Sequence, residues 1–99
     1  MKKARSKYIY RKGRYYERKT RIKLKKDGFY TIRSAASKGI VDIVAFNNQE
    51  LILIQVKSGA SQFTKKAERQ FLRLPVPLGV KKALWSWKLR RDPIIKILK

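Results

Sequence analysis

The residues whose types and spacing suit chemistry lie in two apolar runs joined by an Asn-Asn turn. Asp42 stands inside the first run, and the second run ends in Gln55, Val56 and Lys57. A carboxylate among apolar side chains costs several kcal/mol unless it is paired with a cation or bound to a metal. We therefore expect Asp42 either in a structural ion pair or in a functional site.

Strand pairing would bring these side chains together. Side chains alternate along a strand, so Gln55 and Lys57 share one face. If the two runs pair through the turn, Asp42 converges with both. The Asp42 carboxylate, the Gln55 amide oxygen and the Val56 carbonyl would then suit Mg²⁺, which prefers oxygen ligands. Lys57 beside that metal could orient or activate a water, or stabilise charge on a phosphate.

The composition points to a polyanionic partner. The 99 residues include 27 Lys and Arg against 6 Asp and Glu, which gives a formal net charge of +21 and a pI of about 10.9. A chain with this charge repels itself, and each phosphate that Lys or Arg neutralises releases counterions. Nucleic acid is the expected partner, with an anionic membrane surface as the competitor.

Several function classes are excluded. The chain has no cysteine and no histidine, which removes thiol catalysis, most zinc sites and Ser-His-Asp chemistry. No apolar run approaches the roughly 20 residues that span a bilayer. The start MKKARSKYIYRK has no signal-peptide apolar region. We therefore expect no membrane association and a cytoplasmic protein, near the nucleoid or in the host cytoplasm if the source is viral.

The hydrophobic periodicity predicts one domain over residues 13–99 after a flexible basic arm over residues 1–12. Tyr16, Thr20 and Leu24 form the inward stripe of the first helix. The expected elements are a helix, three strands, a helix and two strands, at residues 13–26, 29–34, 40–46, 50–58, 64–73, 82–87 and 94–98.

The aromatic residues leave two interpretations open. Trp85 and Trp87 share one face of a predicted strand, which favours packing in the core or at a dimer interface. Four tyrosines either pack on the core or a partner subunit, or stack on unpaired bases: Tyr8, Tyr10, Tyr15 and Tyr16.

The spacing of Asp42 and Gln55-x-Lys57 resembles the pattern of the PD-(D/E)xK nuclease superfamily, with Gln in place of the middle acid. A longer stretch resembles the archaeal-type Holliday junction resolvases over about residues 10–59: YRKGRYYERKTRIKLKKDGFYTIRSAASKGIVDIVAFNNQELILIQVKSG. The resemblance implies an α/β restriction-endonuclease-like fold, a mixed five-stranded sheet flanked by helices in the order α-β-β-β-α-β-β.

The resemblance also implies roles for single residues. Asp42 matches the principal metal ligand, Gln55 the second acid and Lys57 the catalytic lysine. Glu17 matches the helix glutamate that completes the metal site, although its spacing also fits a solvated acid paired with a helix arginine. DNA contacts fall on the basic helix start, the arginine beside the glutamate, the R-S pair and the following loop: Arg11, Lys12, Arg14, Arg18, Arg33, Ser34, Ser37 and Lys38.

Three departures from the family pattern stand out. Gln55 is neutral where the family has Glu, so Mg²⁺ affinity and nuclease rate are both expected to suffer. The loop AASKGI is one residue longer than usual, and Ile40-Val41 stands where many nucleases have proline before the aspartate.

The expected function is therefore metal-dependent cleavage of branched or duplex DNA. The resemblance favours a homodimeric Holliday junction resolvase that makes paired nicks in four-way junctions, with Mg²⁺ as cofactor and Mn²⁺ able to substitute. One rival is another nuclease of the superfamily that cuts flaps, ends or mobile-element DNA. The other rival is a non-catalytic basic nucleic-acid-binding protein in which Gln55 marks a decayed site.

Overall fold

The fold was obtained as a computed structural model that describes residues 2–34, 40–58, 63–88 and 90–98, with side chains from Arg14 onward. The observed order of elements is the predicted one, α-β-β-β-α-β-β. The elements are α1 (Lys2–Lys26), β1 (Tyr30–Arg33), β2 (Ile43–Phe46), β3 (Leu51–Ser58), α2 (Lys65–Arg73), β4 (Lys81–Trp87) and β5 (Ile94–Leu98).

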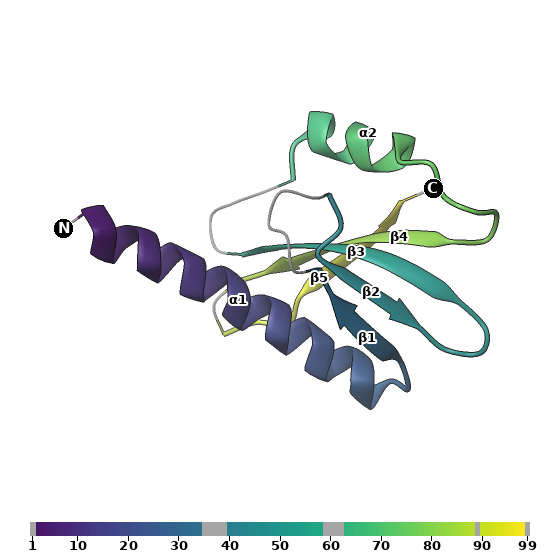
Figure 1. The fold of residues 1–99 in the computed structure, drawn as a ribbon, viewed down its shortest axis with the longest axis horizontal. Helices are drawn as coiled ribbons and strands as arrows, with labels where there is room; N and C mark the ends of the chain where they lie inside the picture. Colours follow the sequence, from purple (N-terminus) through teal and green to yellow (C-terminus); the bar gives the residue numbers. More distant parts are fainter. Residues whose placement is uncertain (1, 35–39, 59–62, 89, 99) are drawn as a thin grey trace.

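The five strands form one mixed sheet in the order β1-β2-β3-β4-β5. Only β3 and β4 pair in parallel, and the other neighbours are antiparallel. A parallel pair needs a crossover connection, and α2 lies within the one between β3 and β4. Figure 1 shows α2 above β4 and the long α1 running alongside the sheet. The predicted mixed five-stranded sheet is therefore confirmed.

The sheet separates two apolar clusters. The side that faces α1 carries the larger cluster, which includes Trp85 and Trp87 at 4% and 5% exposure. The other side carries Phe71 of α2 packed with Leu84 and Leu98. The two tryptophans therefore belong to the core, and they are too buried to form a dimer interface.

The buried stripe of α1 fixes how this helix lies on the sheet. Tyr16, Thr20 and Leu24 are buried, as the spacing predicted. The Trp87 Nε1 donates a hydrogen bond of 2.7 Å to the Thr20 hydroxyl, which itself donates to the Tyr16 carbonyl at 2.7 Å. Because a buried donor without a partner is costly, these two hydrogen bonds hold the helix at one rotation over the sheet.

The ends of the helices follow from their sequences. α1 stops where Gly28 adopts a φ of 92°, and the Phe29 amide bonds back to the Leu24 carbonyl at 3.0 Å. This is a Schellman ending, which needs the left-handed conformation that glycine adopts without strain. Thr64 caps α2 as its position suggests, because its hydroxyl accepts from the Ala67 amide at 3.0 Å.

Two predicted boundaries were wrong. The first helix begins at Lys2 rather than Gly13, so its backbone includes the segment expected as an arm. Lys, Arg and Ala are strong helix formers, and this propensity outweighs the repulsion between neighbouring charges. The second strand begins at Ile43, so Asp42 precedes the strand instead of interrupting it. The division into an arm over residues 1–12 and a nuclease domain stays a prediction.

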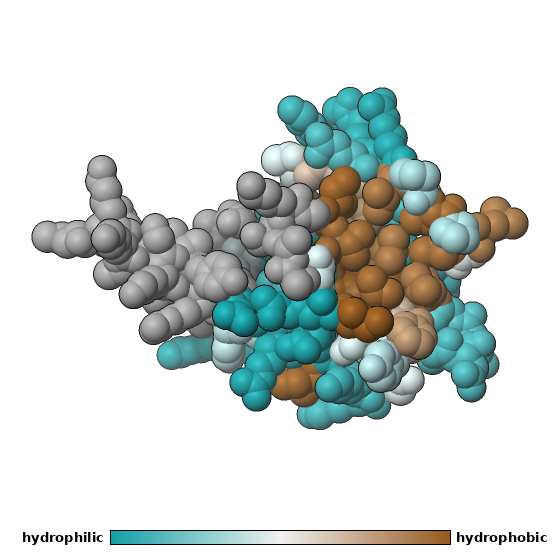
Figure 2. Space-filling view, in the orientation of Figure 1, coloured by the Kyte–Doolittle hydropathy of each residue, from teal (hydrophilic) through white to brown (hydrophobic). Residues whose placement is uncertain are grey.

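One part of the sheet presents apolar side chains to solvent. Tyr30 and Ile32 are 65% and 51% exposed. They pair across the strands with Phe46 and Val44, which therefore share their face. We call these four residues the apolar β1–β2 face. Figure 2 shows apolar surface gathered over the strands between the two helices.

Neither α1 nor α2 is long and apolar enough to cross a membrane, within the residues described.

Candidate active site

Asp42 is held beside β3 by two hydrogen bonds. Its backbone amide donates to the Ile54 carbonyl at 2.9 Å, and its carboxylate Oδ2 accepts from the Val56 amide at 2.8 Å. These two bonds lie on either side of Gln55 in the sequence of β3. The convergence of Asp42 with the end of β3, predicted from strand pairing, is therefore what the fold produces.

The side-chain amide oxygen of Gln55 is a buried polar atom in β3 without a hydrogen-bond partner among the described residues. This atom, Oε1, accepts no hydrogen bond from any residue in the described part of the chain. Buried polar atoms are nearly always paired, so an orphaned oxygen indicates a missing partner such as a water or a metal ion. A cation that approached Asp42 would supply that partner.

Glu17 reaches the same region from α1. Its carboxylate Oε1 lies 3.4 Å from the Arg33 Nε at the end of β1, close enough for an ion pair. The geometry of this contact is not that of a hydrogen bond. Glu17 is thus not a freely solvated helix acid. The ion pair ties the helix to β1 and holds the carboxylate at the rim of the sheet.

Burial raises the pKa of both carboxyl groups, and the charge of Asp42 also affects the pKa of Glu17. Burial raises the pKa of Glu17 above its usual range and the negative charge of Asp42 adds to the rise, while Arg33 and Arg21 oppose it. Burial also raises the pKa of Asp42, against the Val56 hydrogen bond and the charge of Lys57. Desolvated like charges of this kind are costly without a cation, and they are typical of functional sites.

Lys57 lies close enough to Asp42 for its positive charge to lower the pKa of the Asp42 carboxyl. It is partly buried at the end of β3 and follows Gln55 by two residues, so both side chains leave the strand on one face. The structure therefore brings Glu17, Asp42 and Lys57 within electrostatic reach of one another, and Gln55 lies in β3 between the two residues that hydrogen-bond to Asp42.

The DNA-binding candidates are spread more widely. Arg14 and Arg18 are exposed on α1. Arg33 is partly buried in its ion pair with Glu17, and the Ser34 amide donates to the Asp42 carbonyl at 2.9 Å. The remaining candidates have side chains outside the described part of the structure: Arg11, Lys12, Ser37 and Lys38.

Sequence reasoning missed one residue of this site. Arg21 is half-buried, it lowers the pKa of Glu17, and its Nε has no partner among the residues described. The signal was available, because Glu17 and Arg21 are four apart and face the same flank of a helix. By itself, this spacing indicated only a solvated ion pair between the helix acid and an arginine.

The donor set suits a hard divalent cation. Two carboxylates and a buried amide oxygen without a donor are oxygen ligands, and Mg²⁺ completes such sets with water. No cluster of three acidic, histidine or cysteine residues occurs in the described ranges, which agrees with the neutral Gln55. The residues fit a site for a hard divalent cation that carries less negative charge than three carboxylates would.

These observations define the class of the chain. The five-stranded mixed sheet with two helices is the α/β arrangement that the sequence predicted for a restriction-endonuclease-like fold. The chain belongs to the archaeal Holliday junction resolvase family, since the family described as archaeal Holliday junction resolvase (hjc) matches residues 8–74.

Two similar proteins support this membership. The crossover junction endodeoxyribonuclease Hjc of Methanocaldococcus jannaschii is 43% identical over 51 residues, which are 52% of this chain and 38% of that protein. The chain thus matches well under half the length of this curated relative. A solved structure of Archaeoglobus fulgidus Hjc, a Holliday junction resolvase from an archaeal hyperthermophile, shares the fold. It has a TM-score of 0.70 and 25% identity, over 85% of this chain and 70% of that chain.

Proposed function

We propose that the protein is a structure-selective DNA endonuclease that resolves four-way junctions by metal-dependent hydrolysis of phosphodiester bonds. The observation that carries this proposal is the meeting of Asp42 with the end of β3, where Gln55 offers a buried oxygen without a partner. Family membership supplies the substrate class. A protein with a net charge of +21 has the electrostatic attraction that DNA requires.

Glu17, Asp42 and the Gln55 amide oxygen would hold Mg²⁺, with Mn²⁺ able to substitute and the Val56 carbonyl as a further ligand. When bound, the ion would polarise the scissile phosphate and lower the pKa of a coordinated water. Lys57 would orient the attacking water and balance negative charge on the phosphate. Arg33 would position Glu17 through their ion pair.

We also propose that the active species is a homodimer. Paired nicks on opposed strands need two sites of matched orientation, which a twofold axis provides. The apolar β1–β2 face supports this assembly, because exposed Tyr30 and Ile32 lie beside Phe46 on one surface of an otherwise strongly cationic protein. An isologous contact through this face would bury apolar area without bringing the cationic surfaces together.

A second function deserves testing because Gln55 is neutral. A site with one carboxylate fewer binds Mg²⁺ less tightly, and a protein that kept only its DNA affinity would bind junctions without cutting them. Cleavage of DNA by the wild type separates this non-catalytic role from an enzyme.

The test is cleavage of a synthetic four-way junction, a flap and a linear duplex, each with Mg²⁺, with Mn²⁺ and with EDTA. We expect paired nicks in the junction that need the metal and vanish in Asp42→Asn. Preferred cutting of the flap or of ends would assign a different nuclease activity. Binding without cutting under any of these conditions would leave the non-catalytic role.

A further inference from the structure

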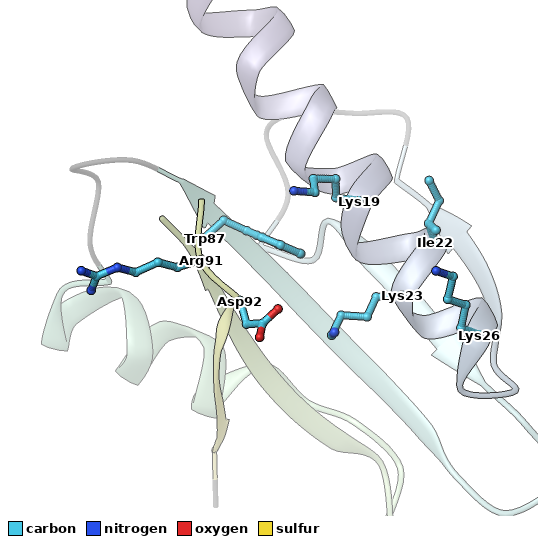
Figure 3. A pocket seen from close by; sticks show the side chains of 7 residues that line it. All are labelled: Lys19, Ile22, Lys23, Lys26, Trp87, Arg91 and Asp92. Atoms are coloured by element: carbon cyan, nitrogen blue, oxygen red, sulfur yellow. The ribbon is translucent and has the colours of Figure 1, made fainter. Parts of the chain in front are cut away.

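A basic groove lies along α1, away from the catalytic carboxylates. It has a volume of about 320 Å³, and its lining brings four cations together with a single carboxylate: Lys19, Lys23, Lys26, Arg91 and Asp92, with Trp87 at its base. In Figure 3, Lys19 and Lys23 extend from the helix toward Trp87 and Asp92, while Arg91 lies across from them with its guanidinium directed away from the two lysines.

The cations of this groove do not form ion pairs with other described residues of the chain. In the described part of the chain the recorded ion pairs join other residues, and none involves Lys23, Lys26 or Arg91. Lys19 is the exception in having a packing role, since its Nζ lies 5.0 Å from the centre of the Trp87 ring. Like charges four apart on a helix repel each other. An external anion would relieve that repulsion.

The groove and the catalytic carboxylates lie on opposite flanks of α1. Successive residues of a helix are about 100° apart, so Glu17 and Lys19 differ by about 200°. The buried stripe of Tyr16, Thr20 and Leu24 points at the sheet between the two flanks. Lys19 to Lys26 covers about 10 Å along the helix axis, enough to follow a strand of phosphates rather than to bind one small anion.

We propose that this groove binds backbone phosphates of a DNA arm other than the arm being cut. The inference rests on the proposed junction-resolving function. Duplex DNA has a persistence length of about 150 base pairs and does not fold around a helix at low cost. A straight duplex therefore reaches one flank of α1, whereas a junction with diverging arms reaches both.

The test compares two double variants that remove equal charge. Lys23→Gln with Lys26→Gln removes from the groove two cations that form no ion pair among the described residues. Lys25→Gln with Lys65→Gln removes two exposed lysines that do not line it. Binding of a four-way junction, and of a linear duplex with the same arm sequence, is measured in EDTA over a range of salt concentrations.

We expect the groove variant to bind the junction roughly tenfold more weakly than the control variant, with a salt slope smaller by about 2. On the duplex, the two variants should agree within about twofold. Asp92→Asn removes the one carboxylate among the described lining residues of the groove and should tighten junction binding. Melting curves that match the wild type verify that each variant is folded.

Two results would overturn the inference. Equal junction affinities for the groove and control variants would show that no phosphate occupies the groove. An equal loss on junction and duplex would make it a general phosphate contact and would refute the second-arm role. Wild-type cleavage of the junction is measured in parallel. If the wild type does not cut while the groove variant alone loses junction binding, the proposed nuclease activity is refuted and the proposed phosphate binding by the groove is supported.

Discussion

At the scale of single residues, the site combines desolvated carboxylates with a neutral ligand. Glu17 and Asp42 both have a raised pKa because burial disfavours their charged forms. Gln55 adds an oxygen without adding a third negative charge that would worsen this repulsion. The site is therefore less costly when empty than a site of three acids, and it attracts a cation less strongly.

Asp42→Asn should separate binding from cutting. We expect cleavage to fall by at least roughly 10²-fold, because the principal ligand is lost. Junction affinity should stay the same or rise slightly, since a negative charge near the phosphate is removed. Gel-shift titration in EDTA, beside cleavage with Mg²⁺, measures both. Equal loss of binding and cutting would show that Asp42 only maintains the fold.

The same substitution has a stability signature with a definite sign. Because burial raises the pKa of Asp42 in the folded state, ionising this carboxyl destabilises the fold as the pH rises through that pKa. Below the unfolded pKa of about 4 the penalty is absent. Without divalent ions, Asp42→Asn should therefore melt higher than the wild type near pH 7, and the difference should shrink toward pH 4. Added Mg²⁺ should stabilise the wild type more than the variant.

Gln55 decides whether the site works or has decayed. If the amide oxygen is a working ligand, Gln55→Ala should remove cleavage, and Gln55→Glu should lower the Mg²⁺ concentration needed for half-maximal rate. If the site has decayed, the wild type should cut nothing and Gln55→Glu should restore cleavage. Inactivity of both the wild type and a folded Gln55→Glu would leave Asp42 and Lys57 as a structural pair.

At the scale of elements, α1 is the helix that places Glu17 beside the edge of the sheet. Its buried stripe packs on the sheet, and the bond from Trp87 to Thr20 fixes its rotation over β4. A rotation of this helix would move Glu17 away from Arg33 and away from Asp42. The position of the Glu17 carboxylate therefore depends on a hydrogen bond made one turn further along the helix.

Thr20→Val tests this dependence. The substitution keeps the shape of the side chain but leaves the Trp87 Nε1 buried without an acceptor, at a cost of about 1–3 kcal/mol. The melting temperature of a domain of this size should fall by about 4–8 °C for each kcal/mol. Cleavage at a temperature where the variant is folded should fall as well. Thr31→Val, on the part-buried β1, is a control whose hydroxyl has no partner among the described residues. A stable variant with full activity would show that packing alone places Glu17.

At the scale of the whole molecule, we expect the charge and one apolar face to govern how the protein associates. The net charge of +21 favours binding to a polyanion such as DNA, and we expect that binding to weaken steeply with salt. Between 50 and 200 mM salt we expect a loss of about 10³-fold or more in junction affinity. An affinity nearly constant over that range would contradict phosphate neutralisation as the source of binding.

The apolar β1–β2 face should carry the dimer contact. Ile32→Asp places a charge at its centre and should convert a dimer into a monomer in sedimentation at micromolar concentration. Leu78→Asp is the matched control, since Leu78 is fully exposed in the loop before β4 and is not part of the apolar β1–β2 face. Dissociation by Leu78→Asp instead would place the interface at residues 76–80, the loop that contains Leu78. A wild type that sediments as a monomer, with or without DNA, would refute paired nicking by a dimer.

Local patterns in the sequence determined the order of the elements, the end of α1 at Gly28 and the cap at Thr64, because each depends on neighbours within a few residues. The alternation along β3 also predicted that Asp42 would meet Gln55 and Lys57, since a short turn fixes how adjacent strands pair. The family resemblance added Glu17, which no local pattern connects to the others.

Only the tertiary structure decided the features that join distant residues. Helix propensity and charge repulsion oppose each other in residues 2–12, so composition alone did not show that α1 begins at Lys2. The ion pair of Glu17 with Arg33 and the groove between α1 and Arg91 depend on the rotation of the helix over the sheet. That rotation is set by Thr20 and Trp87, 67 positions apart in the chain, whose contact exists only after the sheet has formed.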